Sequence, residues 1–259
     1  MSKPVAVELV DVHKSFRGGR DHVLKGVSLE FYEGELTFVL GPSGTGKSVL
    51  IKHILGLLKP DHGTVHVHGK DMSLLRGADL ADARRVFGML FQSAALFDDL
   101  TVYENVAFPL VEHSDLSNDD IEKKVTTTLG LLGMTSGYDK LPNELSGGMR
   151  KRVGLARAIV REPSILLYDE PTTGLDPVTR STVDELIATL RDKLKLTSIV
   201  VSHDIPAALR LADRIIFLYG GTAVFTGKPS ELWNSNHPTI RGFLEAESMS
   251  LRSLTESRV

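Results

Sequence analysis

The sequence has no cysteine in its 259 residues, which excludes a disulfide framework, a thiol nucleophile and a cysteine-ligated zinc site. It also lacks long apolar runs, since no uninterrupted stretch approaches the roughly 18 residues of a bilayer-spanning helix. Residues 1–5 lack the apolar core of a signal peptide. We therefore expect a soluble, cytoplasmic protein that acts at a membrane only through a partner.

An excess of positive charge is missing as well. The 30 basic and 33 acidic residues give a formal charge of −3, so the composition does not indicate a broad contact with nucleic acid. What the sequence does have is length. A chain of 259 residues lies within the range of a single α/β domain and can bury a full core without disulfides or metal ions.

Short apolar segments are predicted to be strands, and helical patterns separate the later ones. This alternation indicates a mainly parallel sheet covered on both faces. Val65–His68 differs, because it alternates and ends at Gly69, as an exposed antiparallel strand would. The predicted strands are Val5–Val10, Val23–Phe31, Glu35–Leu40, Val65–His68, Val86–Phe91, Ile165–Tyr168, Ile199–Ser202 and Ile215–Tyr219.

The remaining patterns are mostly helical. A helix is predicted from Gly46 to about Leu58, and residues 101–145 are predicted to be a helical subdomain inserted into the sheet. Residues 246–259 are polar and are predicted to be a disordered tail, with packing on a partner subunit as the alternative. Apolar side chains at helical spacing are predicted to face the core: Val153, Ala156, Ile159 and Val160 in one helix, and Val183, Leu186, Ile187, Leu190 and Leu194 in another.

The segment GPSGTGKS fits the phosphate-binding pattern G-x-x-x-x-G-K-[ST] between a predicted strand and a predicted helix. Its backbone N–H groups would point at phosphate oxygens, and the helix N-terminus adds about half a positive charge. Lys47 is predicted to contact the β- and γ-phosphates, and the Ser48 hydroxyl to take one Mg²⁺ position. The alternative is a glycine-rich turn with an accidental lysine. The predicted phosphate-binding residues are Gly41, Pro42, Ser43, Gly44, Thr45, Gly46, Lys47 and Ser48.

Two acids end the predicted strand ILLYDEP, at the sheet edge where open α/β sheets bind ligands. Successive strand residues point to opposite sides, so Asp169 and Glu170 are predicted to have different roles. We assign Asp169 to the Mg²⁺ shell and Glu170 to the attacking water, as general base or orienter. The alternative for Glu170 is a solvated carboxylate paired with an arginine. His203 also follows an apolar strand and is predicted to contact the γ-phosphate, whereas Gln92 alone is a weaker signal.

Ser146-Gly147-Gly148 precedes another predicted helix and offers a second set of bare backbone amides, hence a second anion site. Only the first phosphate-binding loop comes with a lysine and metal ligands. A head-to-tail pair of chains resolves this, if Ser146–Met149 of each chain closes over the ATP held by Gly41–Ser48 of the other.

Together these segments resemble the ATP-binding cassette (ABC) ATPases. GPSGTGKS is similar to their Walker A motif, LSGGM to their signature sequence and ILLYDE to their Walker B motif. Met149 stands where the family more often has glutamine. The resemblance implies adenine stacking for Phe16, catalytic roles for Lys47, Gln92, Glu170 and His203, Mg²⁺ ligation by Ser48, Gln92 and Asp169, and contacts in trans from Ser146, Gly147, Gly148, Met149 and Asp176.

The resemblance further implies a P-loop NTPase of the α/β class. Its RecA-like, mainly parallel sheet would carry an antiparallel β-subdomain and a helical subdomain at about 101–160, in one ATPase domain over 1–245. Segment 91–113 lies where the family docks on a permease, and the chain is most similar to the ATPases of Mla-type lipid transporters. We therefore expect a homodimer with two transmembrane permease subunits, an MCE lipid-binding protein and, in some relatives, a STAS-domain subunit. This places the chain peripherally, on the cytoplasmic face of the inner or plasma membrane.

Two other functions are weighed against this one. A soluble cassette that acts on ribosomes or DNA is disfavoured, because the interval from Lys47 to Ser146 has no sustained heptads and no basic patch. A transporter ATPase for another cargo, such as polar amino acids, stays open. A metal site at His62, His66 and His68 is also disfavoured, on the expectation that no carboxylate is placed to complete a ligand set.

Overall fold

A computed structural model of the chain describes residues 3–246. The strands are β1 Val5–Phe16, β2 Asp21–Tyr32, β3 Leu36–Leu40, β4 His62–Val67, β5 Lys70–Asp71, β6 Phe87–Leu90, β7 Ile165–Asp169, β8 Thr197–Val201, β9 Arg214–Tyr219 and β10 Thr222–Gly227. The helices are α1 Lys47–Ile54, α2 Gly77–Arg84, α3 Val102–His113, α4 Asn118–Leu131, α5 Gly147–Ile159, α6 Pro177–Leu194, α7 Ile205–Leu211 and α8 Pro229–Trp233, with a 3₁₀ turn at Pro142–Glu144 and a further helix over 238–246.

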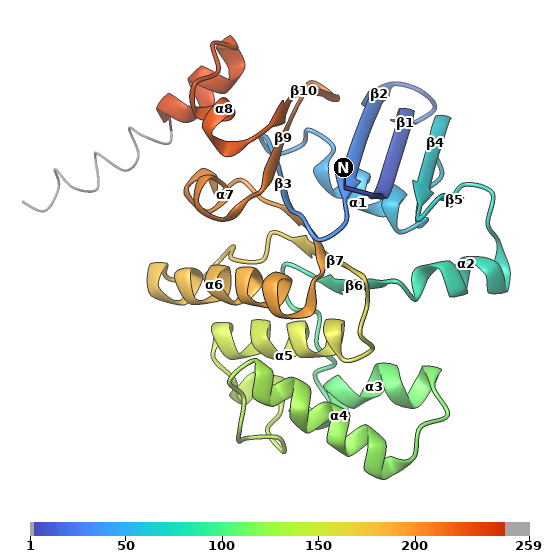
Figure 1. The fold of residues 1–259 in the computed structure, drawn as a ribbon, viewed down its shortest axis with the longest axis vertical. Coiled ribbons are helices and arrows are strands. Elements are labelled where there is room, and N and C mark those ends of the chain that lie inside the picture. The colour runs from blue at the N-terminus through green and yellow to red at the C-terminus, as the bar shows by residue number, and fades with distance from the viewer. Residues whose placement is uncertain (1–2, 247–259) are drawn as a thin grey trace, which may run out of the picture.

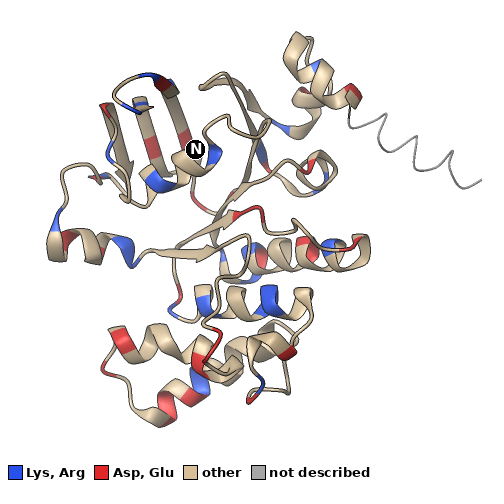
Figure 2. Cartoon of the chain, turned by 180° about the vertical axis from the view of Figure 1, so that it is seen from behind, with Lys and Arg blue, Asp and Glu red and all other residues tan. Residues whose placement is uncertain are grey.

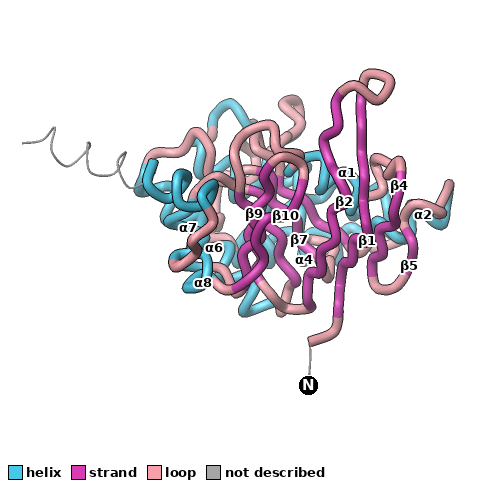
Figure 3. Tube along the Cα trace, turned by 90° about the horizontal axis from the view of Figure 1, so that it is seen from above, coloured by secondary structure: helices cyan, strands magenta, loops and turns pink. Residues whose placement is uncertain are grey.

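Two sheets organise the molecule (Figure 1). The larger has the order β10-β9-β3-β8-β7-β6, in which only β10 runs antiparallel to its neighbour. The smaller has the antiparallel order β2-β1-β4-β5. Seen from above, β2 lies beside β10 (Figure 3), where the Lys25 N–H donates to the Gly221 carbonyl at 2.8 Å. The predicted α/β fold with an antiparallel β-subdomain is confirmed.

The central strands β3, β7 and β8 are buried along almost their whole length because both faces of the larger sheet are covered. In β3, Leu36, Phe38 and Leu40 belong to one core cluster together with apolar residues of α3 to α7. Val39 points the other way, into a cluster shared with α1 and the smaller sheet. Because successive side chains of a strand point to opposite faces, the same strand packs against the helices on one face and against α1 and the smaller sheet on the other.

The helical part of the chain, α3 to α5, forms a separate lobe below the larger sheet in Figure 1. A capping box starts α3, since the Thr101 side chain accepts from the Glu104 N–H and the Glu104 carboxylate accepts from the Thr101 N–H. The charged residues of α5 are all basic, whereas α3 carries acidic ones and α4 carries both signs (Figure 2). Among the described residues, no helix combines the length and the apolar character that crossing a bilayer would take.

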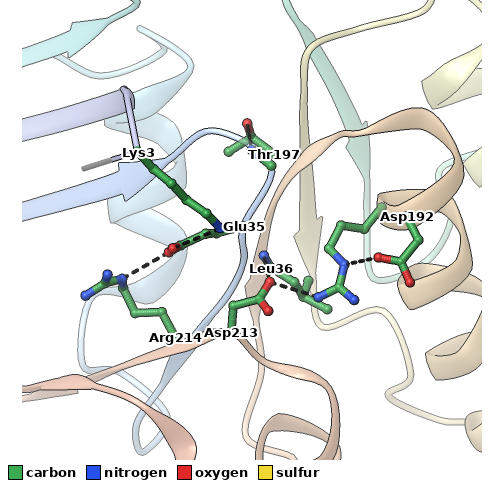
Figure 4. A network of polar contacts seen from close by, with 9 residues as sticks. Lys3, Glu35, Leu36, Asp192, Thr197, Asp213 and Arg214 are labelled. Atoms are coloured by element: carbon green, nitrogen blue, oxygen red, sulfur yellow. Dashed lines mark hydrogen bonds and ion pairs between the residues drawn. The ribbon is translucent and has the colours of Figure 1, made fainter. Parts of the chain in front are cut away.

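A polar network ties together the amino ends of the parallel strands, opposite to the edge at which the predicted site residues lie (Figure 4). The nearly buried Glu35 carboxylate pairs with Lys3 Nζ at 3.3 Å and with Arg214 Nε at 3.2 Å. Next to it, the Leu36 N–H donates to Asp213 Oδ2 at 2.8 Å. These contacts fix β3 against β9 at one end and leave the other edge to the site.

Several boundaries differ from the predictions. The helix predicted to reach Leu58 ends at Ile54, because Gly56 takes a left-handed conformation at φ 64°. The first strand continues past Val10 to Phe16 through an irregular pairing at Asp11. Leu194, predicted to face the core, is exposed at the end of α6. The predicted tail, 246–259, lies outside the described residues apart from residue 246, which still belongs to the last helix.

The predicted exposed strand is β4, and it is half buried instead. Val65 and Val67 face the core cluster shared with α1, since β4 pairs with β1. His68 lies outside β4 with a left-handed φ of 45°, so it does not share a strand face with His66 as the alternation predicted.

Candidate functional site

The loop between β3 and α1 needs its glycines for two separate reasons. Gly41 has φ 146°, and a Cβ there would lie 2.2 Å from the Leu218 carbonyl oxygen of the neighbouring strand β9. Gly46 has φ 98° and faces the side chain of Leu24, which would be 2.8 Å from an added Cβ. Both positions therefore exclude any side chain. Because Gly41 lies against β9 and Gly46 against β2, the loop is held between these two strands. Its backbone amides lie at the N-terminus of α1, where anions bind favourably.

Lys47 is the first residue of α1, and its ammonium group folds back over the loop. Its Nζ donates to the carbonyl oxygens of Gly41 at 2.7 Å and Pro42 at 2.9 Å. Burial lowers the pKa of Lys47, and the nearby carboxylates of Glu170 and Asp169 act in the opposite direction. The lysine is thus a buried cation held by neutral oxygens, beside the space that the loop encloses.

A cavity of about 700 Å³ opens over this loop. Residues from β1, the β3–α1 loop and the ends of β6, β7 and β8 line it, because the carboxyl ends of parallel strands meet at one edge. Thr173, Asp21 and Val23 line it as well and were not predicted. The predicted residues that line it are Phe16, Ser43, Gly44, Gly46, Lys47, Ser48, Gln92, Glu170 and His203.

Asp169 and Glu170 differ in their surroundings because the backbone turns at Glu170. The predicted reason, alternation along a strand, does not apply, since Glu170 lies beyond β7. β7 ends at Asp169, and Glu170 has a left-handed φ of 49°, which is unusual for a residue with a side chain. Asp169 Oδ1 accepts from the Ser48 hydroxyl at 3.5 Å. Burial raises the pKa of Asp169 most, and the nearby Glu170 carboxylate raises it further. The hydrogen bond from Ser48 and the charge of Lys47 act in the opposite direction.

The Glu170 carboxylate contacts two polar side chains from different parts of the chain. Its Oε2 lies 2.8 Å from Nδ1 of His203, at the end of β8, and accepts from the Thr173 hydroxyl at 3.0 Å. The Glu170 N–H also donates to the Val201 carbonyl at 2.9 Å, which fixes the backbone between β7 and β8. His203, predicted as a phosphate contact, faces Glu170 in this arrangement.

Ser146 and the two glycines that begin α5 lie away from the main cavity. Ser146, Gly148 and Met149 line a second cavity of about 400 Å³, and Ser146 caps α5 by accepting from the Met149 N–H at 3.3 Å. A Cβ on Gly148 would lie 2.6 Å from Cγ2 of Thr179 on α6, so this glycine also serves packing within the chain. Asp176, predicted to act in trans, caps α6 by accepting from the N–H groups of Val178 and Thr179.

Lys151 is a site-linked residue that the sequence reasoning missed. Its side chain is buried, and Nζ donates to the main-chain carbonyl of Gln92 at the end of β6. Burial lowers the pKa of Lys151 to about 8, against the attraction of Glu170. A signal was present, because Lys151 stands four residues before Leu155 and eight before Ile159, on the buried face of the helix.

The loop after Gln92 is held from inside by two further residues that were not predicted. Asn105 is fully buried and bonds the backbone of Phe97 twice, accepting its N–H at 2.9 Å and donating to its carbonyl at 3.1 Å. Arg157 on α5 donates to the carbonyls of Ala94 at 2.9 Å and Ala95 at 2.8 Å. Both alanines have positive φ, so these bonds hold a backbone that would otherwise relax.

An exposed apolar surface covers the outside of this loop. Phe91, Phe97, Phe108 and Val111 are exposed, and we call these four residues the docking surface. The rings of Phe97 and Phe108 lie 4.8 Å apart, beside a cavity of about 390 Å³ that all three phenylalanines line. Apolar residues gathered in this way on a surface are typical of a protein contact.

The reason given against a histidine metal site was wrong, since carboxylates do face the three histidines. His62 Nδ1 lies 3.2 Å from an oxygen of Asp11, and His66 Nδ1 lies 3.7 Å from one of Glu8. His68 Nδ1 similarly lies 3.5 Å from Glu33. The three histidines pair with three different acids, so they do not form one ligand set among themselves.

Residues 24–173 match the protein family described as ABC transporter. The chain is 44% identical over 255 residues to the protein TRIGALACTOSYLDIACYLGLYCEROL 3, chloroplastic, of Arabidopsis thaliana, covering 92% of this chain and 73% of that protein. It is 38% identical to the probable ribonucleotide transport ATP-binding protein mkl of Mycobacterium tuberculosis, with 98% of this chain and 70% of that one covered. It is also 38% identical to the intermembrane phospholipid transport system ATP-binding protein MlaF of Escherichia coli, with 95% and 91% covered.

Solved structures agree with this similarity. The structure of cbiO1 from Clostridium perfringens, part of the ABC transporter complex cbiONQ, superposes with a TM-score of 0.83 at 31% identity, covering 90% of this chain and 92% of that one. A dimeric ATP-binding cassette in a post-hydrolysis state, bound to ADP and Pi, superposes with a TM-score of 0.77 at 33% identity, covering 86% and 98%.

Proposed function

Since the chain belongs to the ABC transporter family of ATPases, we propose that two copies bind two ATP molecules head to tail and drive a separate membrane permease. We further propose that the cargo is phospholipid or another lipid of the cell envelope, carried with an MCE lipid-binding protein. The chain then lies peripherally on the cytoplasmic face of the inner or plasma membrane, through its contact with the permease.

The observation that carries this proposal is the division of the predicted residues between two cavities. The main cavity has the phosphate loop, Glu170 and His203 on its walls, but Ser146 and Gly148 line the second cavity. One chain therefore presents an ATP site on one surface and a helix N-terminus without a phosphate site on another. A head-to-tail dimer joins the two, which is consistent with the dimeric cassette among the similar structures.

In the proposed reaction, Phe16 stacks on adenine and the amides of the β3–α1 loop bind the phosphates. Lys47 turns from the loop carbonyls to the β- and γ-phosphates, exchanging neutral acceptors for charged ones. Glu170, with Oε2 held by Thr173 and His203, uses its carboxylate to orient and deprotonate the attacking water. His203 then lies between Glu170 and the γ-phosphate and stabilises the charge that develops there.

The residues present also fit a Mg²⁺ ion. Ser48 and Asp169 offer oxygen ligands 3.5 Å apart, the ligand type that Mg²⁺ prefers, with Gln92 across the cavity. Burial, followed by the nearby Glu170 carboxylate, raises the pKa of Asp169, and a bound cation would stabilise the charged form of this carboxylate. When bound, the ion neutralises charge on the β- and γ-phosphate oxygens.

The docking surface is proposed to transmit closure to the permease. Gln92 lines the ATP cavity, and its main-chain carbonyl accepts from Lys151 of α5. The loop that follows is held by Asn105 and Arg157 and carries Phe97 on its outside. A movement of the cavity wall would thus reach the docking surface and α5 together.

The proposed lipid cargo rests on similarity to the phospholipid transport protein MlaF, together with the chloroplastic relative. The relative named for ribonucleotide transport keeps another, polar cargo as the second candidate. The lipid cargo and the polar cargo predict different proteins bound to the permease. An MCE protein and bound phospholipid support the first, and a soluble binding protein for a polar solute supports the second.

Lys47→Ala is expected to lower kcat for ATP hydrolysis by about 10²–10³-fold, because it removes the buried cation beside the phosphate loop. Steady-state phosphate release and binding of a fluorescent ATP analogue measure the effect. Lys52→Ala, one turn further along α1 and exposed, is the matched control and should keep near-normal turnover. Normal hydrolysis by Lys47→Ala would remove the lysine from the mechanism.

Phe108→Asp is expected to abolish copurification with the permease while ATP binding by the isolated chain is kept, because it places a charge in the apolar docking surface. Affinity purification from membranes in mild detergent, followed by mass spectrometry of proteins and lipids, measures this. Leu74→Asp changes an equally apolar, exposed residue elsewhere and should not affect copurification. Copurification of a permease without an MCE protein or phospholipid would reject the lipid cargo and leave the ATPase assignment intact.

A further inference from the structure

Asp11, His13 and His62 bring three metal-ligating side chains together on the smaller sheet, and none of them lines the ATP cavity. Asp11 Oδ1 lies 3.0 Å from His13 Nε2, and Asp11 Oδ2 lies 3.2 Å from His62 Nδ1. One ligand atom from each residue lies within 4.8 Å of the others. We propose that these side chains form a binding site for a divalent transition-metal ion of the zinc class.

The sheet pairing brings the two histidines face to face. His13 of β1 and His62 of β4 are register partners, although β1 and β4 are far apart in the sequence (Figure 3). Their rings meet edge to face with centroids 5.5 Å apart. The strands are hydrogen-bonded neighbours, so the spacing of the two imidazoles is set by the backbone and does not depend on flexible loops.

An irregularity in β1 places the carboxylate between them. The register with β4 shifts between Val10 and His13, and Asp11 takes a left-handed φ of 48° while its N–H donates to Ser28 Oγ at 2.9 Å. Two glycines leave room for this turn. A Cβ on Gly63 would lie 2.2 Å from the Asp11 carbonyl oxygen, and one on Gly26 would lie 2.9 Å from Asp11 Oδ1. Gly63 therefore makes room for the backbone of Asp11, and Gly26 makes room for its carboxylate.

Two imidazole nitrogens and one carboxylate oxygen are a ligand set that suits zinc and its neighbours in the first transition row. Bonds of about 2.0–2.1 Å to a tetrahedral ion place ligand atoms about 3.3 Å apart. His13 Nε2 and His62 Nδ1 each lie 3.0–3.2 Å from a different oxygen of Asp11, and one ligand atom from each of the three residues already lies within 4.8 Å of the others, so a small turn of the carboxylate brings one oxygen to both imidazoles. All three side chains are at least partly exposed, so an ion can enter and water can complete its coordination. Mg²⁺ prefers oxygen ligands and would not compete.

The test is Zn²⁺ titration of the tag-free full chain by calorimetry in excess Mg²⁺, with Co²⁺ absorption as a second probe. Wild type should bind about one Zn²⁺ at this site, and His62→Ala should weaken that affinity by about tenfold or more. Asp11→Asn should weaken it too, and asparagine tolerates the left-handed backbone, so the fold is kept. His66→Ala is the matched control, because His66 also lies on β4 opposite a β1 carboxylate but belongs to a two-residue pair.

Zn²⁺ bound by the acids of the ATP cavity would persist in His62→Ala, so the difference between the two titrations isolates the proposed site. Thermal melting gives an independent reading, since Zn²⁺ should raise Tm in wild type and in His66→Ala more than in His62→Ala. Equal Zn²⁺ affinity and stoichiometry in wild type and His62→Ala would overturn the proposal. So would the absence of Zn²⁺ binding by folded wild type, which would leave Asp11 as a hydrogen-bond acceptor for two histidines.

Discussion

Glu170→Gln is expected to lower kcat for ATP hydrolysis by about 10²–10⁴-fold while ATP binding is retained, because the amide keeps the shape of the side chain but cannot accept a proton. The residue has an unusual left-handed conformation, and its Oε2 accepts from the Thr173 hydroxyl and lies 2.8 Å from His203 Nδ1. With hydrolysis blocked, ATP should hold two chains together. Single-turnover kinetics and size-exclusion chromatography with ATP would measure the two effects.

Glu185→Gln is the matched control for this change. Glu185 is an exposed carboxylate on α6 that lines no part of the ATP cavity, so its loss should leave turnover within a factor of about two. If Glu170→Gln hydrolyses ATP at the wild-type rate, Glu170 has no part in the chemistry. If it blocks hydrolysis but yields no ATP-dependent dimer, the carboxylate is catalytic and the proposed closure is wrong.

Ser146→Arg is expected to reduce turnover by about 10²-fold or more without preventing ATP from binding to the phosphate loop. Ser146 caps α5 and lines the second cavity, so a long cationic side chain there would keep the amides of α5 away from the nucleotide held by the second chain while the two chains still pair. It lies outside the main cavity, which is why binding by a single chain should be unaffected. Equilibrium ATP binding and steady-state hydrolysis, measured on the same preparation, separate the two quantities.

Mixing two inactive variants tests the head-to-tail arrangement directly. In a mixed dimer of Ser146→Arg and Lys47→Ala, one site combines the intact phosphate loop of one chain with the intact Ser146 segment of the other, and the second site carries both defects. Activity should therefore return on mixing, to about a quarter of the wild-type value for random pairing of independent sites. If each chain completed its own site, neither variant could repair the other and the mixture would stay inactive.

Much of the fold was predictable because its patterns are local. The strands buried on both faces are short and mostly apolar segments, as in Leu36–Leu40 and in residues 165–168, and neither segment needs knowledge of its neighbours to be recognised. Boundaries were less predictable where one residue changes the backbone. Gly56 ended α1 earlier than the apolar pattern indicated, and β1 continued through the turn at Asp11 because the pairing with β2 resumes beyond it.

The candidate site was also predictable from the sequence only in part. The phosphate loop and the acids of β7 were identified from spacing, but the contacts between elements were not. Nothing in the spacing indicates that His203 lies 2.8 Å from Glu170, or that Lys151 reaches the carbonyl of Gln92. These pairs join residues from different strands and helices, so they depend on how the elements pack.

The sequence by itself determined that this chain carries a phosphate-loop pattern rich in glycine and a second helix N-terminus, because each feature lies within a few consecutive residues. Only the tertiary structure decided that the two lie in separate cavities. It also decided that Asp11 meets two histidines, one from its own strand and one from a distant strand. The physical reason is that a local pattern fixes backbone conformation, whereas proximity between distant segments is set by strand register and by the packing of helices on a sheet.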